Sequence, residues 1–261
     1  MRNSEILHSF NEQRSEFRPY GLSFEFWIPK LMKKPDRHNE IEFNYLTEGS
    51  ITYFFHGSKI TIPAKRLTVF WGLVPHQIIG YEGSTPYFVG TIPLTQFLEW
   101  KLPFKFVDRI LQGDILLENS GTNSYFEEYL INNWINDLST NKSTRATLLE
   151  IQARLLRMAD NMLDAETVEL KRTQSNEISQ VEKIAMFIAQ NFTLPIKSAD
   201  IGKKVGLHPD YANVIFKKTF GMSIHEYLIQ ERISHAQRKL ISSDVSVTDI
   251  LYDCGFNSIS S

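Results

Sequence analysis

Short apolar runs separated by turn residues fill the chain from about residue 22 to residue 90. The runs are rich in Phe, Tyr, Ile, Val and Thr, and Gly or Pro residues interrupt them regularly. Regularly spaced short strands of this kind predict an all-β sandwich or barrel. Gly57 predicts a hairpin turn between two of the runs, because such turns need a residue with positive φ. The expected strands lie in LSFEFWI, IEFNYLT, SITYFFHG, SKITIPA, RLTVFWG and HQIIGYEG.

A helical period replaces the strand pattern after TIPLTQFLEW. Two apolar stripes follow, and each should line one face of a helix. The first stripe consists of Phe126, Leu130, Trp134 and Leu138. The second consists of Leu148, Ile151 or Gln152, Leu155, Ala159 and Met162. Two interpretations stay open: each stripe packs on the strands or on its neighbouring helix, or the stripes form a dimer seam.

A polar segment without a period, Glu166 to Ser179, follows the second stripe. It is nearly free of large apolar residues, which is typical of a linker between domains. We therefore expect a boundary near residue 174, with one domain in residues 1–174 and a second in residues 175–261.

Beyond the linker the pattern is that of short, capped helices. A helix opened by Ser198 is followed by a turn at GLH and by a helix with Pro209 at its first position, where proline is tolerated. This order predicts a helix-turn-helix. Its small core should consist of Ile201, Val205, Leu207, Ala212, Ile215 and Phe216. Its outward face should carry Asp210, Asn213, Val214 and Lys217.

The next segment predicts a long helix. Ser223 and Glu226 have the spacing of a capping box, and the helix that they open should reach about Ile241. It would join the first helix-turn-helix to the remaining residues.

The first pattern then returns. Ser246 can cap another helix, and the turn at Gly255 follows 49 residues after the corresponding Gly206. The buried side of this helix should consist of Val247, Ile250 and Leu251. We expect the first helix and turn of a second helix-turn-helix, whose recognition helix would begin at Ser258 and is cut off.

These C-terminal residues resemble the DNA-binding domain of AraC/XylS-type transcription regulators. The similarity rests on F-K-K-x-x-G-M-S-x-x-x-Y-L-x-x-x-R-I between the two units and V-T-D-I-x-x-x-x-G-F in the second, and it covers Glu177 to Ser261. Leu251 departs from the family pattern, which usually has Ala there. The pattern also continues beyond Ser261, so the resemblance implies a DNA-binding domain truncated within its second helix-turn-helix.

The N-terminal half is similar to the effector domain of melibiose-operon-type members of this family. The similarity lies in DRHNEIEFNYLTEGSITYFFHGSKITIPAKRLTVFWGLVPHQI, including FW followed by PHQ. The implied fold class is α+β: an N-terminal cupin-like β-barrel with appended helices, followed by an all-α AraC-type helix-turn-helix domain.

Composition agrees with a globular, non-membrane protein. The chain is 42% apolar and 22% charged, with a net charge of −2. No apolar run approaches the length of a membrane span, and the first residues lack the apolar core of a secretory signal. Cys254 is the only cysteine, which excludes an internal disulfide and a Cys-based zinc site. We therefore expect a cytoplasmic protein without a membrane partner.

Charge argues against strong DNA binding. Residues 177–261 contain nine Lys and Arg and nine Asp and Glu, whereas a DNA-binding domain is usually basic. We expect weaker binding than that of a full-length relative.

By position in the resemblance, the first recognition helix would read bases through Asp210, Asn213 and Val214. Asn213 can bond adenine, Asp210 can accept from cytosine N4, and Val214 can contact a thymine methyl group. Phosphate contacts, which position without specifying, would come from His208, Lys217, Lys218, Arg232, Arg238 and Lys239. The alternative for each charged residue is a solvated surface charge.

The expected barrel has a candidate polar site. By the motif of cupin enzymes, His38, Glu42 and His76 are possible metal ligands, with Asp36 where another His would stand. One His is therefore missing, and we expect neither metal nor cofactor. Two further interpretations are hydrogen-bonded polar groups in the barrel mouth and an effector site. The effector site would consist of His38, Glu42, Asn44, Trp71 and His76.

Together these patterns predict a transcription regulator rather than an enzyme. It would bind double-stranded DNA, respond to a small effector, expected to be a carbohydrate, and act with RNA polymerase as a homodimer on a sugar-utilisation operon. The alternatives are a metal-dependent cupin enzyme with an ancillary helical domain and a non-functional truncated regulator.

Overall fold

The chain forms two compact units. The computed structural model describes residues 7–55, 57–118, 124–140, 142–164, 180–242 and 245–256. The sheet unit comprises residues up to Pro93 and from Trp100 to Asn176, and the helical unit comprises Leu94–Glu99 and the residues from Glu177 onward. The linker expected at residues 166–179, with its boundary near residue 174, lies outside the described residues.

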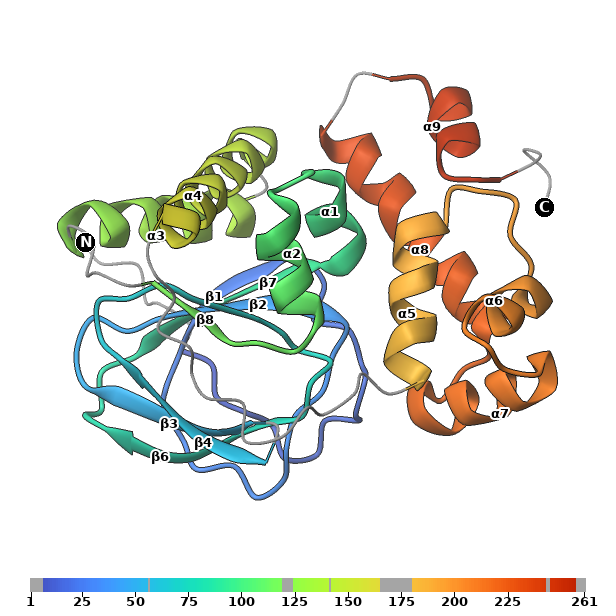
Figure 1. Ribbon diagram of the computed structural model, residues 1–261. Coiled ribbons are helices and arrows are strands. Elements are labelled where there is room, and N and C mark those ends of the chain that lie inside the picture. The colour runs from blue at the N-terminus through green and yellow to red at the C-terminus, as the bar shows by residue number, and fades with distance from the viewer. Residues whose placement is uncertain are drawn as a thin grey trace. The chain divides into compact units, whose positions relative to one another are not determined.

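The sheet unit contains two antiparallel sheets (Figure 1). The strands are β1 (Ser23–Trp27), β2 (Glu40–Tyr45), β3 (Ser50–Phe55), β4 (Ser58–Pro63), β5 (Thr68–Trp71), β6 (His76–Glu82), β7 (Tyr87–Pro93) and β8 (Leu116–Leu117). One sheet has the order β1-β7-β2-β5-β8 and the other has the order β4-β3-β6. The α+β class is confirmed, and all six expected strands are present. The sequence pattern did not indicate β7 and β8.

The two sheets are not closed into one barrel, contrary to the expectation. The edge of the larger sheet is formed by β8, which pairs with β5 at only two positions. The isolated bridge between Asp36 and His76 gives a further antiparallel contact outside the named strands. The sheets instead face each other across a shared apolar core that includes Phe55, Phe70 and Ile78.

Strand β2 lies in the middle of the larger sheet and is buried on both faces. Glu42 faces the space between the sheets, whereas Phe43 faces the helices and stacks with Phe24. Phe24 in turn meets the edge of Trp134. This agrees with the alternation of side chains along a strand.

Three helices complete the sheet unit: α2 (Phe104–Leu111), α3 (Ser124–Ser139) and α4 (Thr144–Asp164). In Figure 1, α3 and α4 lie over the larger sheet, on the side away from β3, β4 and β6. The buried residues of α3 include Glu127, Ile131 and Trp134, while Phe126 is 52% exposed. Of the predicted stripe on α3, Trp134 is buried as expected, whereas Phe126 is exposed and a charged residue, Glu127, occupies the buried side.

Glu127 is buried because it has a charged partner. The Arg154 guanidinium donates to both carboxylate oxygens of Glu127 at 3.0 Å and to those of Glu118 at 3.0 and 2.9 Å. All three side chains are almost completely buried. One arginine on α4 thus ties α3 and the segment after β8 together. The predicted stripe on α4 is largely confirmed, with Leu148, Ile151, Leu155 and Ala159 buried.

The helical unit consists of α1 (Leu94–Glu99), α5 (Gln180–Asn191), α6 (Ser198–Lys204), α7 (Pro209–Phe220), α8 (Ile224–Ser242) and α9 (Val247–Asp253). Helices α6 and α7 form the expected helix-turn-helix, with Gly206 at φ +77° in the turn. Ile201, Ala212 and Phe216 are completely buried as predicted. Gly202 lets the two helices approach closely, because a Cβ there would lie 2.9 Å from the Pro209 Cα.

The second copy of the pattern is also formed as far as it is described. The Glu226 carboxylate accepts from the Ser223 N–H, and the Ser223 hydroxyl accepts from the Glu226 N–H, which confirms the capping box of α8. Ser246 caps α9, and Gly255 has φ +81°.

Two details of this second copy concern packing. Ile250 and Cys254 are buried, but Val247 is 67% exposed, so its predicted burial was wrong. The recognition helix expected from Ser258 lies outside the described residues. Within the described part of the chain, no helix has the length and apolar character needed to cross a membrane.

Candidate DNA-binding face and ligand cavity

The α7 helix presents an exposed edge. Val214 and Tyr211 are 63% and 55% exposed, although both are large apolar or aromatic side chains. Asp210 lies beside them, and its carboxylate is 3.6 Å from the ring of His208, itself largely exposed. Lys217 and Lys218 continue the same face. The edge thus combines a hydrogen-bond acceptor, an apolar group and cations, which are the chemical types that read bases and hold phosphates.

Two of the predicted DNA contacts point elsewhere. The Asn213 Oδ1 accepts from the Ile224 N–H at 3.0 Å and so caps the start of α8. The Arg232 guanidinium is buried and donates to the carbonyls of Phe192 and Leu194, both at 2.7 Å. These side chains serve the packing of the helical unit. The local sequence pattern does not indicate these contacts, because all three partners, Ile224, Phe192 and Leu194, are distant in the chain.

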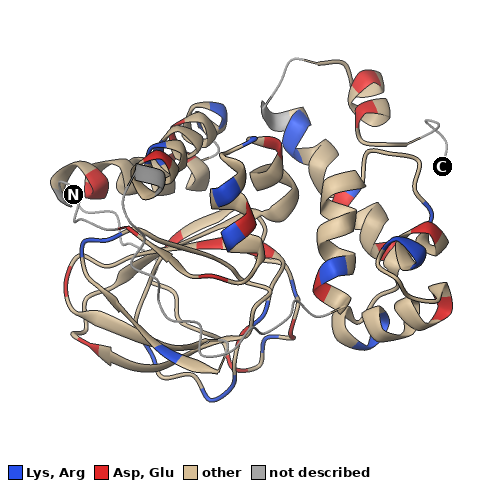
Figure 2. Cartoon of the chain, in the orientation of Figure 1, with Lys and Arg blue, Asp and Glu red and all other residues tan. Residues whose placement is uncertain are grey.

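Tyr211 was not predicted as part of the exposed edge, although helical spacing could have found it, since it lies between Asp210 and Val214. Lys239, a predicted phosphate contact, is 3.0 Å from the Asp253 carboxylate. Figure 2 shows charges of both signs on the helical unit, in line with its neutral composition.

A small cavity of about 30 Å³ lies between the two sheets, and the empty space is about 540 Å³ when its open mouth is counted. Carboxylate, hydroxyl, imidazole and indole groups reach it, together with apolar side chains. Its polar and aromatic lining includes Tyr20, Trp27, Asp36, Glu42, Tyr53, His76, Tyr87 and Thr91. Of the five predicted effector contacts, the structure places Glu42 and His76 at this cavity.

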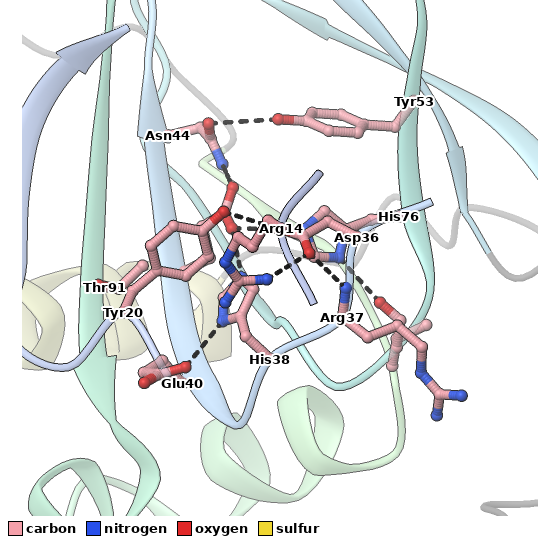
Figure 3. Close-up of polar contacts among 12 residues, drawn as sticks. Arg14, Tyr20, Asp36, Arg37, His38, Glu40, Asn44, Tyr53, His76 and Thr91 are labelled. Carbon is pink, nitrogen blue, oxygen red and sulfur yellow. Dashed lines mark hydrogen bonds and ion pairs between the residues drawn. The ribbon is translucent and has the colours of Figure 1, made fainter. Parts of the chain in front are cut away.

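The remaining three lie behind the lining or on the opposite face. His38 is completely buried and donates to Glu40 and Glu42 at 3.1 and 2.8 Å (Figure 3). Asn44 donates to the other Glu42 oxygen at 2.9 Å and therefore orients that carboxylate. Trp71 pairs with Ile41 in the sheet, on the face opposite Glu42, and donates to Asn39.

An aromatic plate is nevertheless present at the cavity, in Trp27. Its indole N–H donates to the Glu25 carboxylate at 3.0 Å, its ring stacks on His8, and Tyr20 meets it edge-on at 5.9 Å. The ring orientation is thus set before any ligand enters. Alternation in β1 could have indicated Trp27, but nothing local in the sequence tells which face of that strand is inward.

Asp36 is held by two side chains. The Arg14 guanidinium donates to one carboxylate oxygen at 2.6 Å, and the Tyr20 hydroxyl donates to the other at 2.8 Å (Figure 3). The same guanidinium lies over the Tyr20 ring at 3.8 Å. Burial and the neighbouring Asp36 carboxylate raise the pKa of Tyr20 far above its usual value. Tyr20 therefore remains a neutral hydrogen-bond donor.

Charge at Glu42 is balanced by His38. Burial alone would lower the pKa of His38, but the hydrogen bonds to Glu40 and Glu42 outweigh it and raise the pKa to about 9. Burial would raise the pKa of Glu42, but the hydrogen bonds from His38 and His76 hold it well below the usual range. An imidazolium and a carboxylate therefore face each other at neutral pH. The His38 ring also requires a glycine at position 72, because a Cβ there would lie 2.1 Å from the His38 Cε1.

The possible metal ligands do come together. Ligand atoms of Asp36, His38 and His76 lie within 4.8 Å of one another, and all three residues are buried. However, both nitrogens of His38 and both oxygens of Asp36 already have protein partners, including the Arg14 cation. The His76 Nδ1 donates to the Val74 carbonyl. A divalent ion would have to displace these partners, so the donor set fits a metal poorly.

The helix-turn-helix geometry and the exposed α7 edge define the helical unit as that of a DNA-binding protein. A family described as "Helix-turn-helix domain" matches residues 201–261. The melibiose operon regulatory protein of Escherichia coli is 26% identical over 92% of this chain and 81% of its own length. The Msm operon regulatory protein of Streptococcus mutans is 28% identical over 34% of this chain and 32% of its own length. The helical unit therefore contains a helix-turn-helix domain, and the chain as a whole is similar to transcription regulators of the AraC/XylS type.

Two solved structures are also similar. The AraC-like transcriptional activator CuxR is 12% identical, with a TM-score of 0.43, over 82% of this chain and 72% of its own. ToxT from Vibrio cholerae is 14% identical, with a TM-score of 0.37, over 94% of this chain and 88% of its own.

Proposed function

We propose that the chain regulates a sugar-utilisation operon, binding operator DNA through α7 and a carbohydrate effector between its two sheets. The observation that carries the proposal is the similarity to the melibiose operon regulatory protein, which extends over 92% of the chain and so includes both units. The exposed α7 edge and the polar cavity supply a place for each ligand. The regulator would act in the cytoplasm, with RNA polymerase.

DNA binding can be tested with duplexes selected from a random library. Val214→Asp places a carboxylate at the centre of the exposed edge and should abolish retention of the selected duplex. Leu240→Asp is the matched control, because Leu240 is also an exposed apolar residue of the helical unit, 50% exposed on α8. Equal loss of binding in both variants, or none in Val214→Asp, would refute α7 as the recognition helix.

The lining of the cavity suits a polyhydroxylated ligand because it offers carboxylates as acceptors and an oriented aromatic face, and the lining side chains would have to move apart to admit one. The carboxylates of Asp36 and Glu42 can accept from sugar hydroxyls, and the Trp27 ring can cover an apolar sugar face. Isothermal titration with a panel of saccharides tests this directly. Trp27→Leu should weaken binding of the sugar found, whereas Phe54→Leu, an exposed aromatic residue of β3 outside the cavity lining, should not.

The proposal includes a homodimer. Tyr125, Phe126 and Tyr129 are 86%, 52% and 64% exposed on α3, and Leu149 and Leu156 on α4 are also exposed. Tyr125 and Tyr129 are four residues apart on α3 and so share a face, and exposed aromatic residues are enriched at interfaces. The double substitution Tyr125→Ser and Tyr129→Ser should shift the mass of the DNA-free protein, measured by light scattering, from that of a dimer to that of a monomer. A mass unchanged by this substitution would contradict the surface proposed.

The alternative, a metal-dependent cupin enzyme, rests on the Asp36, His38 and His76 cluster. Metal analysis of the purified protein separates the two functions. We expect substoichiometric metal, because Arg14 and the paired His38 already balance the carboxylates. Iron, manganese or zinc bound near one per chain would favour the enzyme.

A further inference from the structure

One helix of the helical unit comes from a different part of the chain. Helix α1 begins at Leu94, the residue directly after the end of β7, while the other helices of this unit lie after residue 179. Leu94 and Phe97 are almost completely buried, and α1 contacts α5 and α8. The core of the helical unit is thus completed by a segment that is covalently continuous with a strand.

The contacts of α1 with α8 are polar. Thr95 and His235 are almost completely buried, whereas Arg238 is half-buried and Glu99 is exposed. The Arg238 guanidinium donates to the Thr95 hydroxyl at 2.6 Å, and the His235 Nε2 lies 3.1 Å from the Glu99 carboxylate. Burial lowers the pKa of His235 to about 4, so the neutral ring donates to Glu99. Buried polar groups that lose a partner carry a large free-energy cost. A displacement of α1 along α8 would therefore break defined hydrogen bonds, which favours two discrete positions over gradual sliding.

The other end of this continuous segment lines the cavity. Tyr87, Val89 and Thr91 of β7 all reach it, and the Thr91 hydroxyl donates to the Gly21 carbonyl at 2.9 Å. Strand β7 is paired on both sides, with β1 and β2. Only Ile92 and Pro93 separate Thr91 from the start of α1, and both belong to the strand. No loop is present there to absorb a movement of Thr91.

Helix α8 is in turn connected to the DNA-binding edge. The Asn213 side chain of α7 accepts from the first N–H of α8, at Ile224. A change in α8 therefore reaches the helix that carries Asp210 and Val214.

We propose that β7 and α1 are the route by which occupancy of the cavity changes DNA affinity. A ligand against Val89 and Thr91 shifts β7, the shift passes to α1 through the strand end, and the Thr95 and Glu99 hydrogen bonds to α8 report it to α7. Allosteric coupling of this kind usually changes affinity by roughly 5–150-fold. The claim that an effector starts the shift rests on the function proposed above. The mechanical part of the proposal, that a change in β7 reaches α8 through α1, does not.

The mechanical part is tested without any ligand, by a double-mutant cycle on the full chain. Thr91→Val perturbs β7 at the cavity, and Thr95→Val removes the acceptor for Arg238 while keeping the shape of the side chain. The readout is amide hydrogen exchange of α8, residues 224–242. Thr91→Val should change exchange in α8 several-fold in the native background and have no further effect in Thr95→Val.

Thr52→Val is the matched control, because the Thr52 hydroxyl bonds Thr61 in the smaller sheet, away from β7. It should leave exchange in α8 unchanged. Equal effects of Thr91→Val and Thr52→Val, or additive effects of Thr91→Val and Thr95→Val, would overturn the route.

The selected duplex and sugar add a second readout. In the native chain the DNA dissociation constant measured with the sugar should differ from the one measured without it. In Thr95→Val the ratio of these two constants should be close to one, while the sugar still binds. A chain that binds neither ligand refutes the proposed function, and the exchange experiment still decides the route. If Thr95→Val keeps the same ratio of dissociation constants as the native chain, the route through β7 and α1 is contradicted, but the proposed function is not.

Discussion

The sheet unit and the α7 edge differ in the burial and pairing of their charged residues. In the sheet unit Arg154, His38 and Asp36 are buried, and each makes short hydrogen bonds to a group of opposite charge or to a hydroxyl. On α7, Asp210 and Lys217 remain exposed to water. Buried charges must be paired to be tolerated, whereas exposed charges cost little and stay available to a partner. Substitutions should therefore affect folding in the first region and binding in the second.

Removal of Arg154 should have the largest effect. Arg154→Met leaves the Glu118 and Glu127 carboxylates buried without a cation, and breaking a buried pair typically costs about 3–5 kcal/mol. All four tryptophans lie in the sheet unit, so urea unfolding followed by tryptophan fluorescence reports on this unit alone. Arg157→Met, at an exposed position of the same helix, should be nearly neutral. Equal stability of Arg154→Met and Arg157→Met would contradict the view that the buried charge pairs of the sheet unit determine its stability.

The stability of the sheet unit should fall as pH rises above neutrality. The pKa of His38 is raised from 6.5 to about 9 in the folded chain, so its charge stabilises the fold fully below 6.5 and loses this effect as pH rises through 9. The loss is on the order of 3 kcal/mol. Urea unfolding at pH 7 and pH 9.5 measures it. His38→Gln should flatten the dependence, and an identical slope in this variant would contradict the assignment.

Substitutions on the α7 edge should change base preference and leave stability unaltered. Asp210→Ala or Val214→Ala removes a base contact worth about 1–3 kcal/mol of discrimination. Binding to a set of duplexes with single base changes measures this, with thermal unfolding in parallel. A variant that loses affinity uniformly over all duplexes would show that the residue positions the helix instead of reading a base.

Asn213 should behave as the exception on α7. Its side chain caps α8, so Asn213→Ala should cost about 0.5–2 kcal/mol of stability in the helical unit. Circular dichroism during thermal unfolding detects this loss. Asn213→Asp keeps the acceptor oxygen and should retain most of the stability. A stable Asn213→Ala protein with altered base preference would restore Asn213 to the reading edge.

The sequence predicted the helical unit better than the sheet unit. Caps such as Ser223 with Glu226, the proline at 209 and the turn glycines act locally, so they indicate where helices begin and end. The role of Asn213 was missed because its partner, Ile224, lies in the next helix. Local pattern therefore located α7 but did not indicate that Asn213 caps α8.

In the sheet unit the strands were predictable but their facing was not. Phe70 and Trp71 are adjacent in β5, and alternation requires one of them to face inward without saying which. The structure places Phe70 in the core between the sheets, so Trp71 faces away from the cavity. Trp27 and Thr91 reach the same cavity from β1 and β7, which pair only through long-range contacts. The cavity lining could not be assembled from the sequence alone.

Cys254, at the end of α9, carries the single thiol of the chain and is completely buried. Burial also raises the pKa of this thiol, which lowers the fraction of reactive thiolate. A thiol reagent can therefore modify the native protein only when α9 detaches from its neighbours. The labelling rate of Cys254 in the wild-type chain therefore reports how often α9 opens, without any introduced probe.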